Sequence, residues 1–178
     1  SYEYSDKKII NFDKNLKIEK NSINVITGRS GSGKTTLIDI LSGLRKPKGK
    51  IFIDGKETKI FENYDWFSKI VYFSQNSFIF DDNLKENIVL SSEFNQKRLD
   101  DLISIFQLKD LLDRETLGEL SKNISGGQKQ RVALARTLYS SKEIVILDEP
   151  TNNLDQINRN QFINYLKNNS LDKTYIIV

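Results

Sequence analysis

The sequence contains no histidine, no cysteine and no methionine, and only two prolines. The absence of cysteine excludes a disulfide framework, a thiolate metal site and a cysteine nucleophile, and it is compatible with a reducing compartment. The absence of histidine removes the most common general base and metal ligand. Any chemistry must therefore rely on carboxylates, amides, hydroxyls, lysine, backbone dipoles and a cation where one binds.

Long apolar runs and a strong charge bias are also absent. No stretch approaches the roughly 18 apolar residues of a membrane span, and no signal-peptide pattern opens the chain, so we expect these 178 residues to be soluble. The net charge of +3 is diffuse, which argues against nucleic acid as a partner. With 38% hydrophobic residues, the chain can bury the core of one domain, with or without an inserted lobe.

Apolar patterns predict an α/β fold. Most of the predicted elements alternate between strand and helix, as in a parallel sheet covered by helices. Strands are expected at 23–27, 50–54, 69–74, 143–151 and 174–178, and helices from about 34, at 126–139 and at 157–168. Two regions differ: 1–20 predicts antiparallel edge strands, and 76–121 predicts a helical lobe with helices at 83–90, 96–108 and 109–114.

The stretch 28-GRSGSGKT-35 matches the phosphate-binding pattern Gly-x-x-x-x-Gly-Lys-Thr and lies between a predicted strand and a predicted helix. This placement disfavours the alternative of a merely flexible turn. The glycines would let amides wrap a β-phosphate, Lys34 would reach the β and γ oxygens, and Thr35 would ligate Mg²⁺. The predicted nucleotide-binding residues are Gly28, Ser30, Gly31, Ser32, Gly33, Lys34, Thr35 and Thr36.

Two acids end the apolar run 143-EIVILDEPT-151, at the sheet edge where ligands bind in open α/β folds. Taken alone, Asp148 and Glu149 could equally cap or solvate the next turn. Beside a phosphate loop, Asp148 would hold Mg²⁺ through water, and Glu149 would orient or deprotonate an attacking water. In a chain without histidine, Glu149 is the best available base.

A Ser and two Gly stand directly before the helical pattern in 124-ISGGQKQRVALAR-136. Glycine disfavours helix, so two interpretations are open. Ser125 could simply cap the helix. Alternatively, Gly126 and Gly127 could leave bare amides at a helix start for an anion to approach.

Five motifs in order resemble the ATP-binding cassette (ABC) ATPases over essentially the whole chain: GRSGSGKTT (28–36), Gln75, ISGGQKQR (124–131), VILDEPT (145–151) and NNLD (152–155). The resemblance implies a P-loop NTPase fold with a mixed or parallel sheet. Residues 1–75 and 140–178 would form a RecA-like core with an N-terminal antiparallel β subdomain, and 76–139 an inserted helical subdomain carrying the signature motif. It also implies ATP and Mg²⁺ as ligands.

The resemblance further implies that two cassettes, most simply identical, meet head-to-tail around ATP. Ser125, Gly126, Gly127 and Gln128 would then contact the γ-phosphate held by the facing copy. Asp155 resembles the acid that crosses this interface, although Asn152-Asn153 departs from the small residues common in the family.

The resemblance also implies roles for two more residues. Gln75 is similar to the Q-loop residue that touches Mg²⁺ and the attacking water, but it could also be an exposed amide at a strand end. Tyr4 is similar to the aromatic residue that stacks on adenine, with Tyr2 and Phe12 as rivals. Gln75, Lys34 and Glu149 are the predicted catalytic residues, and Thr35, Gln75 and Asp148 the predicted metal ligands.

The stretches 71-VYFSQNSFIFDDNLKENI-88 and 118-GELSKNISGG-127 resemble exporter members of the family. This implies ATP-driven export through transmembrane domains fused N-terminally, on the cytoplasmic face of the membrane (the inner membrane of a bacterium), with Glu119 facing those domains. Two alternatives stay open: an ABC ATPase of the DNA-repair or translation type, and an importer subunit. The sequence does not identify the transported substrate.

The family carries a switch histidine just beyond the strand that 174-TYIIV-178 resembles. Because the chain begins at Ser1 and contains neither methionine nor histidine, we expect it to be a C-terminally truncated part of a longer polypeptide. We further expect ATP binding largely intact and hydrolysis strongly impaired.

Overall fold

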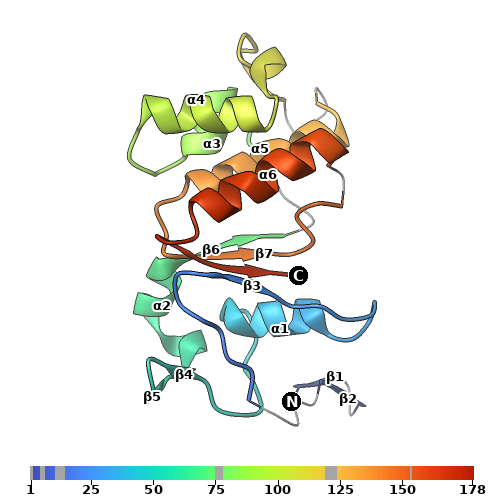
Figure 1. The fold of residues 1–178 in the computed structure, drawn as a ribbon, viewed down its shortest axis with the longest axis vertical. Coiled ribbons are helices and arrows are strands. Elements are labelled where there is room, and N and C mark those ends of the chain that lie inside the picture. Colours follow the sequence, from blue (N-terminus) through green and yellow to red (C-terminus); the bar gives the residue numbers. More distant parts are fainter. Residues whose placement is uncertain (1, 5–6, 11–14, 75–77, 119–123, 153) are drawn as a thin grey trace.

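Four short apolar segments pair in parallel and form the central sheet of the computed structural model, which describes residues 2–4, 7–10, 15–74, 78–118, 124–152 and 154–178. In spatial order the strands are β3 (Ile23–Val25), β8 (Thr174–Ile177), β7 (Ile144–Leu147) and β6 (Ile70–Phe73). The last strand of the sequence therefore lies between β3 and β7. Figure 1 shows the sheet crossing the middle of the molecule.

Helices cover both faces of this sheet (Figure 1). On one face lie α5 (Gly126–Tyr139) and α6 (Gln156–Asn168), and on the other α1 (Lys34–Leu41) and α2 (Tyr64–Lys69). Two further helices, α3 (Leu84–Val89) and α4 (Gln96–Ile105), pack against α5 on the side away from the sheet. The predicted α/β class with an added helical layer is confirmed.

Alternate side chains of the central strands enter two cores. Val145 and Leu147 of β7 are fully buried in the larger core, which continues through α5, α6 and the helical layer. Ile146, between them, packs with Ile38 of α1 and Ile176 of β8 in a smaller core on the opposite face. A strand buried on both faces needs a continuous apolar run, which explains the sequence pattern at this strand.

Short polar side chains fix where the helices begin. At the start of α2, α3, α4, α5 and α6, the residue before the first turn accepts a hydrogen bond from a backbone amide of that turn: Asn63, Asn83, Asn95, Ser125 and Asp155. Such caps satisfy an amide that has no partner inside the helix, and each stabilises its helix by about 1 kcal/mol.

Two antiparallel hairpins accompany the parallel sheet. β1 (Tyr2–Tyr4) pairs with β2 (Lys7–Ile10), with an irregularity between Tyr2 and Glu3. β4 (Phe52–Ile53) pairs with β5 (Lys56–Glu57) around Asp54 and Gly55, whose φ angles are 49° and 79°. Two consecutive positive φ angles are typical of the tight turn that matches the twist of a hairpin.

The structure differs from the sequence prediction in two segments. The expected helix at 109–114 is only a 3₁₀ turn, η2 (Lys109–Leu111), because one such turn suffices to bury both Leu108 and Leu111, three residues apart. Conversely, η1 (Ile60–Glu62) and α2 were not predicted. Helix α2 has too few turns to show a period, and its position depends on a tertiary bond from Trp66 Nε1 to the Leu41 carbonyl (2.8 Å).

The helical layer and the sheet share the larger core. Helix α5 packs on α3 and α4 and also on β6, so it contacts both parts of the chain. The division of the chain at 76 and 139 stays a prediction. Within the described ranges, no helix has both the length and the apolar character required to cross a lipid bilayer.

Two cations meet at the C-terminal end of α5. Arg98 of α4 donates from Nη2 to the carbonyls of Leu138 (2.9 Å) and Ser140 (3.1 Å), and Lys173 Nζ also donates to the Ser140 carbonyl. Cations are favourable here because the helix dipole is negative at this end. Burial, aided by the charge of Arg98, nevertheless lowers the pKa of Lys173 to about 8.

This lowered pKa predicts how stability depends on pH. Between pH 8 and the ordinary lysine value of 10.5, the unfolded chain binds more protons than the folded chain, so the free energy of unfolding should rise with pH. From pH 8 to 10 we expect the wild type to gain about 1–2 kcal/mol relative to Lys173→Met, allowing for solvent screening. Chemical denaturation at several pH values measures this difference.

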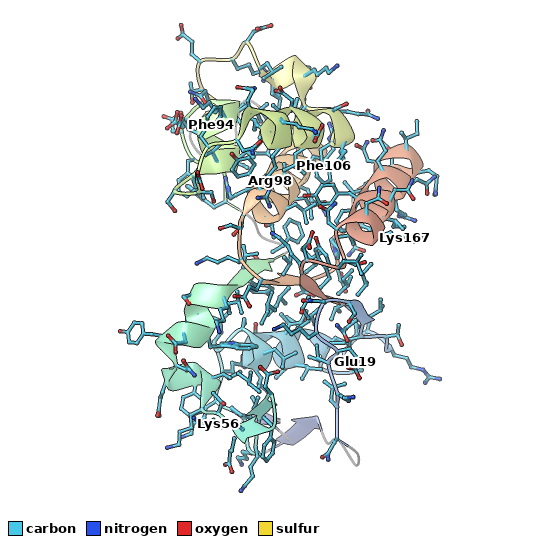
Figure 2. All side chains as sticks on the ribbon, turned by 60° about the vertical axis from the view of Figure 1, so that its left-hand side comes forward. Glu19, Lys56, Phe94, Arg98, Phe106 and Lys167 are labelled. Carbon is cyan, nitrogen blue, oxygen red and sulfur yellow. The ribbon has the colours of Figure 1, made fainter. Side chains whose placement is uncertain are left out.

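The matched control is Lys167→Met, which removes a lysine that points outward on α6 (Figure 2). It should follow the wild-type pH dependence. A parallel pH profile for the wild type and Lys173→Met would contradict the assignment.

Candidate functional site

The phosphate-binding pattern forms an exposed loop between β3 and α1. Gly33 occupies the N-cap position of α1 with φ 90°, a left-handed conformation that favours glycine. At the other end, a β-carbon added to Gly28 would lie 2.7 Å from Ser32 Oγ. The loop therefore closes tightly on itself and leads directly into the first turn of a helix.

The backbone amides of this loop lack acceptors within the protein. Across residues 29–36, all of which the structure describes, the Ser32 amide donates to the Arg29 carbonyl (3.1 Å) and the other amides have no protein acceptor. Lys34 Nζ is held beside them by the carbonyls of Gly28 (3.1 Å) and Arg29 (3.3 Å). Unpaired amides at a helix N-terminus, with an ammonium group beside them, form an anion site.

Asp148 follows directly after β7 and is only 3% exposed. Its Oδ1 is buried without a hydrogen-bond partner, and the Tyr72 hydroxyl lies 3.5 Å from Oδ2. Burial and the charge of Glu149 raise the pKa of the Asp148 carboxyl, while the hydroxyls of Thr35 and Tyr72 partly offset this. A buried carboxylate oxygen without a partner suits a cation brought in by a ligand.

Glu149 adopts an unusual backbone conformation. Its φ of 49° lies in the left-handed region, which is strained for a residue with a side chain. Its amide donates to the Val178 carbonyl (3.0 Å), and the side-chain amide of Asn152 donates to Glu149 Oε2. The carboxylate is thus held at the sheet edge next to Asp148.

Ser125 caps α5 through a reciprocal pair of hydrogen bonds with Gln128. The Gln128 amide donates to Ser125 Oγ (3.2 Å), and the Ser125 amide donates to Gln128 Oε1 (2.9 Å). The capping interpretation is therefore confirmed for Ser125. It does not explain Gly126, because an added β-carbon there would meet nothing within 4 Å. The space over this helix start is open to a ligand from outside the chain.

The structure brings some of the predicted residues together and leaves others apart. Thr35 and Asp148 meet, whereas no hydrogen bond within the described ranges joins the 125–128 helix start to the 28–36 loop. Asp155 caps α6, accepting from the amide (2.8 Å) and side chain (2.7 Å) of Asn158, and these bonds lower its pKa.

For several of the predicted residues the side-chain position is not described. Gln75, Glu119 and Phe12 lie outside the described residues, and for Tyr4 only the backbone, in β1, is described. Within the described ranges no three acidic side chains cluster as a metal site. A Mg²⁺ ion bound by one or two protein groups and phosphate oxygens does not need such a cluster.

Sequence reasoning missed Tyr72. Its strand β6 pairs with β7 in a register that sets Tyr72 beside Ile146, two residues before Asp148. The available signal was a tyrosine within the apolar run 69–74, three residues before Gln75. That signal became meaningful only once the pairing of β6 with β7 was known.

A family model described as "ABC transporter" matches residues 12–152. The chain belongs to the ABC transporter family. Membership of this family implies ATP binding and ATPase activity. The family and the fold predicted from the five sequence motifs are therefore confirmed, while the roles of the individual site residues in this ABC domain stay predictions.

Relatives of this ABC domain are longer proteins. A lactococcin-A transport/processing ATP-binding protein of Lactococcus lactis is 34% identical, over 100% of the chain and 26% of that protein. A Haemophilus influenzae protein named "Probable ABC transporter ATP-binding/permease protein" is 31% identical, over 100% of the chain and 34% of its own length. The chain thus spans about a quarter to a third of these relatives.

A solved structure of a bacterial Atm1-family ABC exporter with ATP bound superimposes with a TM-score of 0.76. It is 27% identical, over 90% of this chain and 29% of that one. The ABC domain therefore shares its fold with part of an exporter.

Proposed function

We propose that this ABC domain is the ATPase module of an exporter, which binds and hydrolyses ATP with Mg²⁺ and powers the export of a substrate across a membrane. The observation that carries the proposal is the loop at 29–36, with its unpaired amides, meeting Asp148, whose Oδ1 is buried and unpaired. The relatives named for transport and the exporter neighbour favour this role over a DNA-repair ATPase, a translation ATPase or an importer subunit.

The residues of the loop would hold the triphosphate. Amides of 29–36 would donate to its oxygens, and Lys34 would exchange its present carbonyl partners for phosphate oxygens. Thr35, Asp148 and Gln75 would hold Mg²⁺, which when bound would neutralise part of the phosphate charge.

Glu149 would act as the base in hydrolysis. Its backbone is fixed by the Val178 carbonyl and its carboxylate by Asn152, so little reorganisation is needed to orient an attacking water. The family's switch histidine has no counterpart here, because these 178 residues contain no histidine. We therefore also propose that they bind ATP more readily than they turn it over.

A second cassette would complete the site. Ser125, Gly126, Gly127 and Gln128 would place the start of α5 against the phosphate held by a facing copy, which explains the open space over Gly126. Asp155 would lie at that interface, and Tyr4 would stack on adenine. The relative named "ATP-binding/permease protein" supports transmembrane domains in the same polypeptide. In this chain they would be fused N-terminally and would place the module on the cytoplasmic face of the membrane.

The test is sedimentation velocity of Glu149→Gln with and without ATP and Mg²⁺. Removing the base should leave nucleotide binding intact and stop turnover, so ATP should convert monomer to dimer. The matched control is Glu143→Gln, an exposed glutamate at the opposite end of β7, which should dimerise with ATP to the same extent as the wild type. If Glu149→Gln stayed monomeric at saturating ATP, the two-cassette arrangement would be wrong.

A further inference from the structure

Arg136, in the last turn of α5, reaches across to the segment that precedes and forms α3. Its Nε donates to the Asn87 carbonyl (2.7 Å), Nη1 to the Phe78 carbonyl (2.6 Å) and Nη2 to Asn87 Oδ1 (2.9 Å). The guanidinium also lies 5.0 Å from the centre of the Phe80 ring. One side chain therefore fixes three points of 78–87 to α5.

Asn87 makes that segment a single unit. It is fully buried, accepts from the Phe80 amide (2.9 Å), and donates to the carbonyls of Phe80, Asp82 and Asn83 (3.0 Å each). A group held to Asn87 is therefore held to the whole turn before α3. Arg136 attaches α5 to this turn through its bonds to Asn87.

Packing alone does not account for an arginine at this position. Burial lowers the pKa of Arg136 to about 10, so the site disfavours the charge that it holds. An apolar side chain would fill the same volume without that cost. Only a planar guanidinium can serve two carbonyls and a side-chain oxygen together, so the contact specifies one register between α5 and 78–87.

The two elements that Arg136 joins lie next to parts of the proposed ATP site. Helix α5 begins at Gly126, directly after Ser125. The segment 78–87 begins three residues after Gln75 in the sequence and follows β6, the neighbour of β7, which directly precedes Asp148. A shift of 78–87 would thus turn α5 and move its first residues.

We propose that Arg136 is a positioning residue that sets the direction of α5 relative to the chain leaving β6, so that Ser125 and Gly126 meet nucleotide bound by a facing copy. The inference rests on the proposed function. Arg136 touches no nucleotide itself and acts through α5.

Arg98 offers a matched comparison. It too holds α5 through two carbonyls, those of Leu138 and Ser140, and its guanidinium lies 5.3 Å from the ring centre of Tyr139. It reaches α5 from α4, as Figure 2 shows, and makes no hydrogen bond to 78–87 within the described ranges. Arg98→Lys therefore weakens the anchoring of α5 without releasing that segment.

The experiment places Arg136→Lys and Arg98→Lys separately in the Glu149→Gln background. Lysine keeps the charge but loses the planar fork. Binding of a fluorescent ATP analogue to monomer at low protein concentration should be unchanged in both, and both should melt at lower temperature. The ATP concentration that half-converts monomer to dimer should rise about tenfold or more for Arg136→Lys and less than twofold for Arg98→Lys.

Equal shifts in the two variants, or no shift for Arg136→Lys, would overturn the inference. If Arg136→Lys fails to fold, Phe80→Leu in the same background tests the idea, because it removes the ring beside the guanidinium and leaves the three hydrogen bonds. Phe80→Leu should raise the ATP concentration that half-converts monomer to dimer about threefold. If that concentration is unchanged, the inference is overturned. Absence of any dimer in Glu149→Gln alone would overturn the proposed function and this inference together.

Discussion

Replacing Lys34 by alanine should weaken ATP binding by about a hundredfold or more. The ammonium group, now held by the Gly28 and Arg29 carbonyls, lies in the same loop as the unpaired amides. Two charge-assisted hydrogen bonds to phosphate contribute about 3 kcal/mol together, and each 1.4 kcal/mol corresponds to a tenfold change in affinity. Isothermal titration with ATP and Mg²⁺ measures the loss.

The control is Lys97→Ala, which removes an equal charge from an exposed position on α4. It should bind ATP within about twofold of the wild type, since distant surface charges are screened. Near-wild-type affinity in Lys34→Ala would show that phosphate is not bound at this loop. A similar loss in both variants would show that net charge, rather than loop geometry, determines binding.

Replacing Asn87 by alanine should lower the free energy of unfolding by about 3 kcal/mol or more. Its side chain satisfies one amide and three carbonyls of the turn before α3 and accepts from Arg136. Each buried polar group left without a partner costs about 1–3 kcal/mol. The truncation also leaves the Arg136 guanidinium short of one acceptor. Urea denaturation followed by circular dichroism measures the change.

Asn83→Ala is the matched control, at the N-cap of the same helix, four residues before Asn87. Asn83 caps α3 through a single bond to the Glu86 amide (2.9 Å), so its loss should cost only about 1 kcal/mol. Similar losses in the two variants would contradict the view that Asn87, rather than the α3 cap, holds this turn together.

The sequence predicted elements best where a local signal and a tertiary requirement agree. The helix at 126–139 has both a capping residue and a long stretch of helical periodicity, and the structure confirms its bounds. The strand at 144–147 is apolar on both faces because both are buried. Helix α2 and the 3₁₀ turn at 109–111 depend on contacts from other elements, such as the bond from Trp66 to α1, which no local pattern reveals.

The candidate site divides in a similar way. Lys34 and Asp148 could be predicted because each belongs to a local motif, a phosphate loop and the end of an apolar strand, whose position in the fold follows from nearby residues. The structure places Thr35 beside Asp148. Tyr72 could not be predicted, because its approach to Asp148 follows from strand pairing between segments about seventy residues apart. Similarly, the open space over Gly126 is a property of the folded surface and not of the motif.

The strand order has a consequence for biosynthesis. The phosphate loop follows β3 and the acids follow β7, yet these strands do not touch, because β8 inserts between them. Ile177 accepts from the Ile26 amide, and Val178 accepts from the Glu149 amide, so the final residues tie the two halves together. A nascent chain emerges from the ribosome N-terminus first. Both halves of the pocket are thus synthesised before β8, but they cannot be locked side by side until translation has passed β8 and Val178.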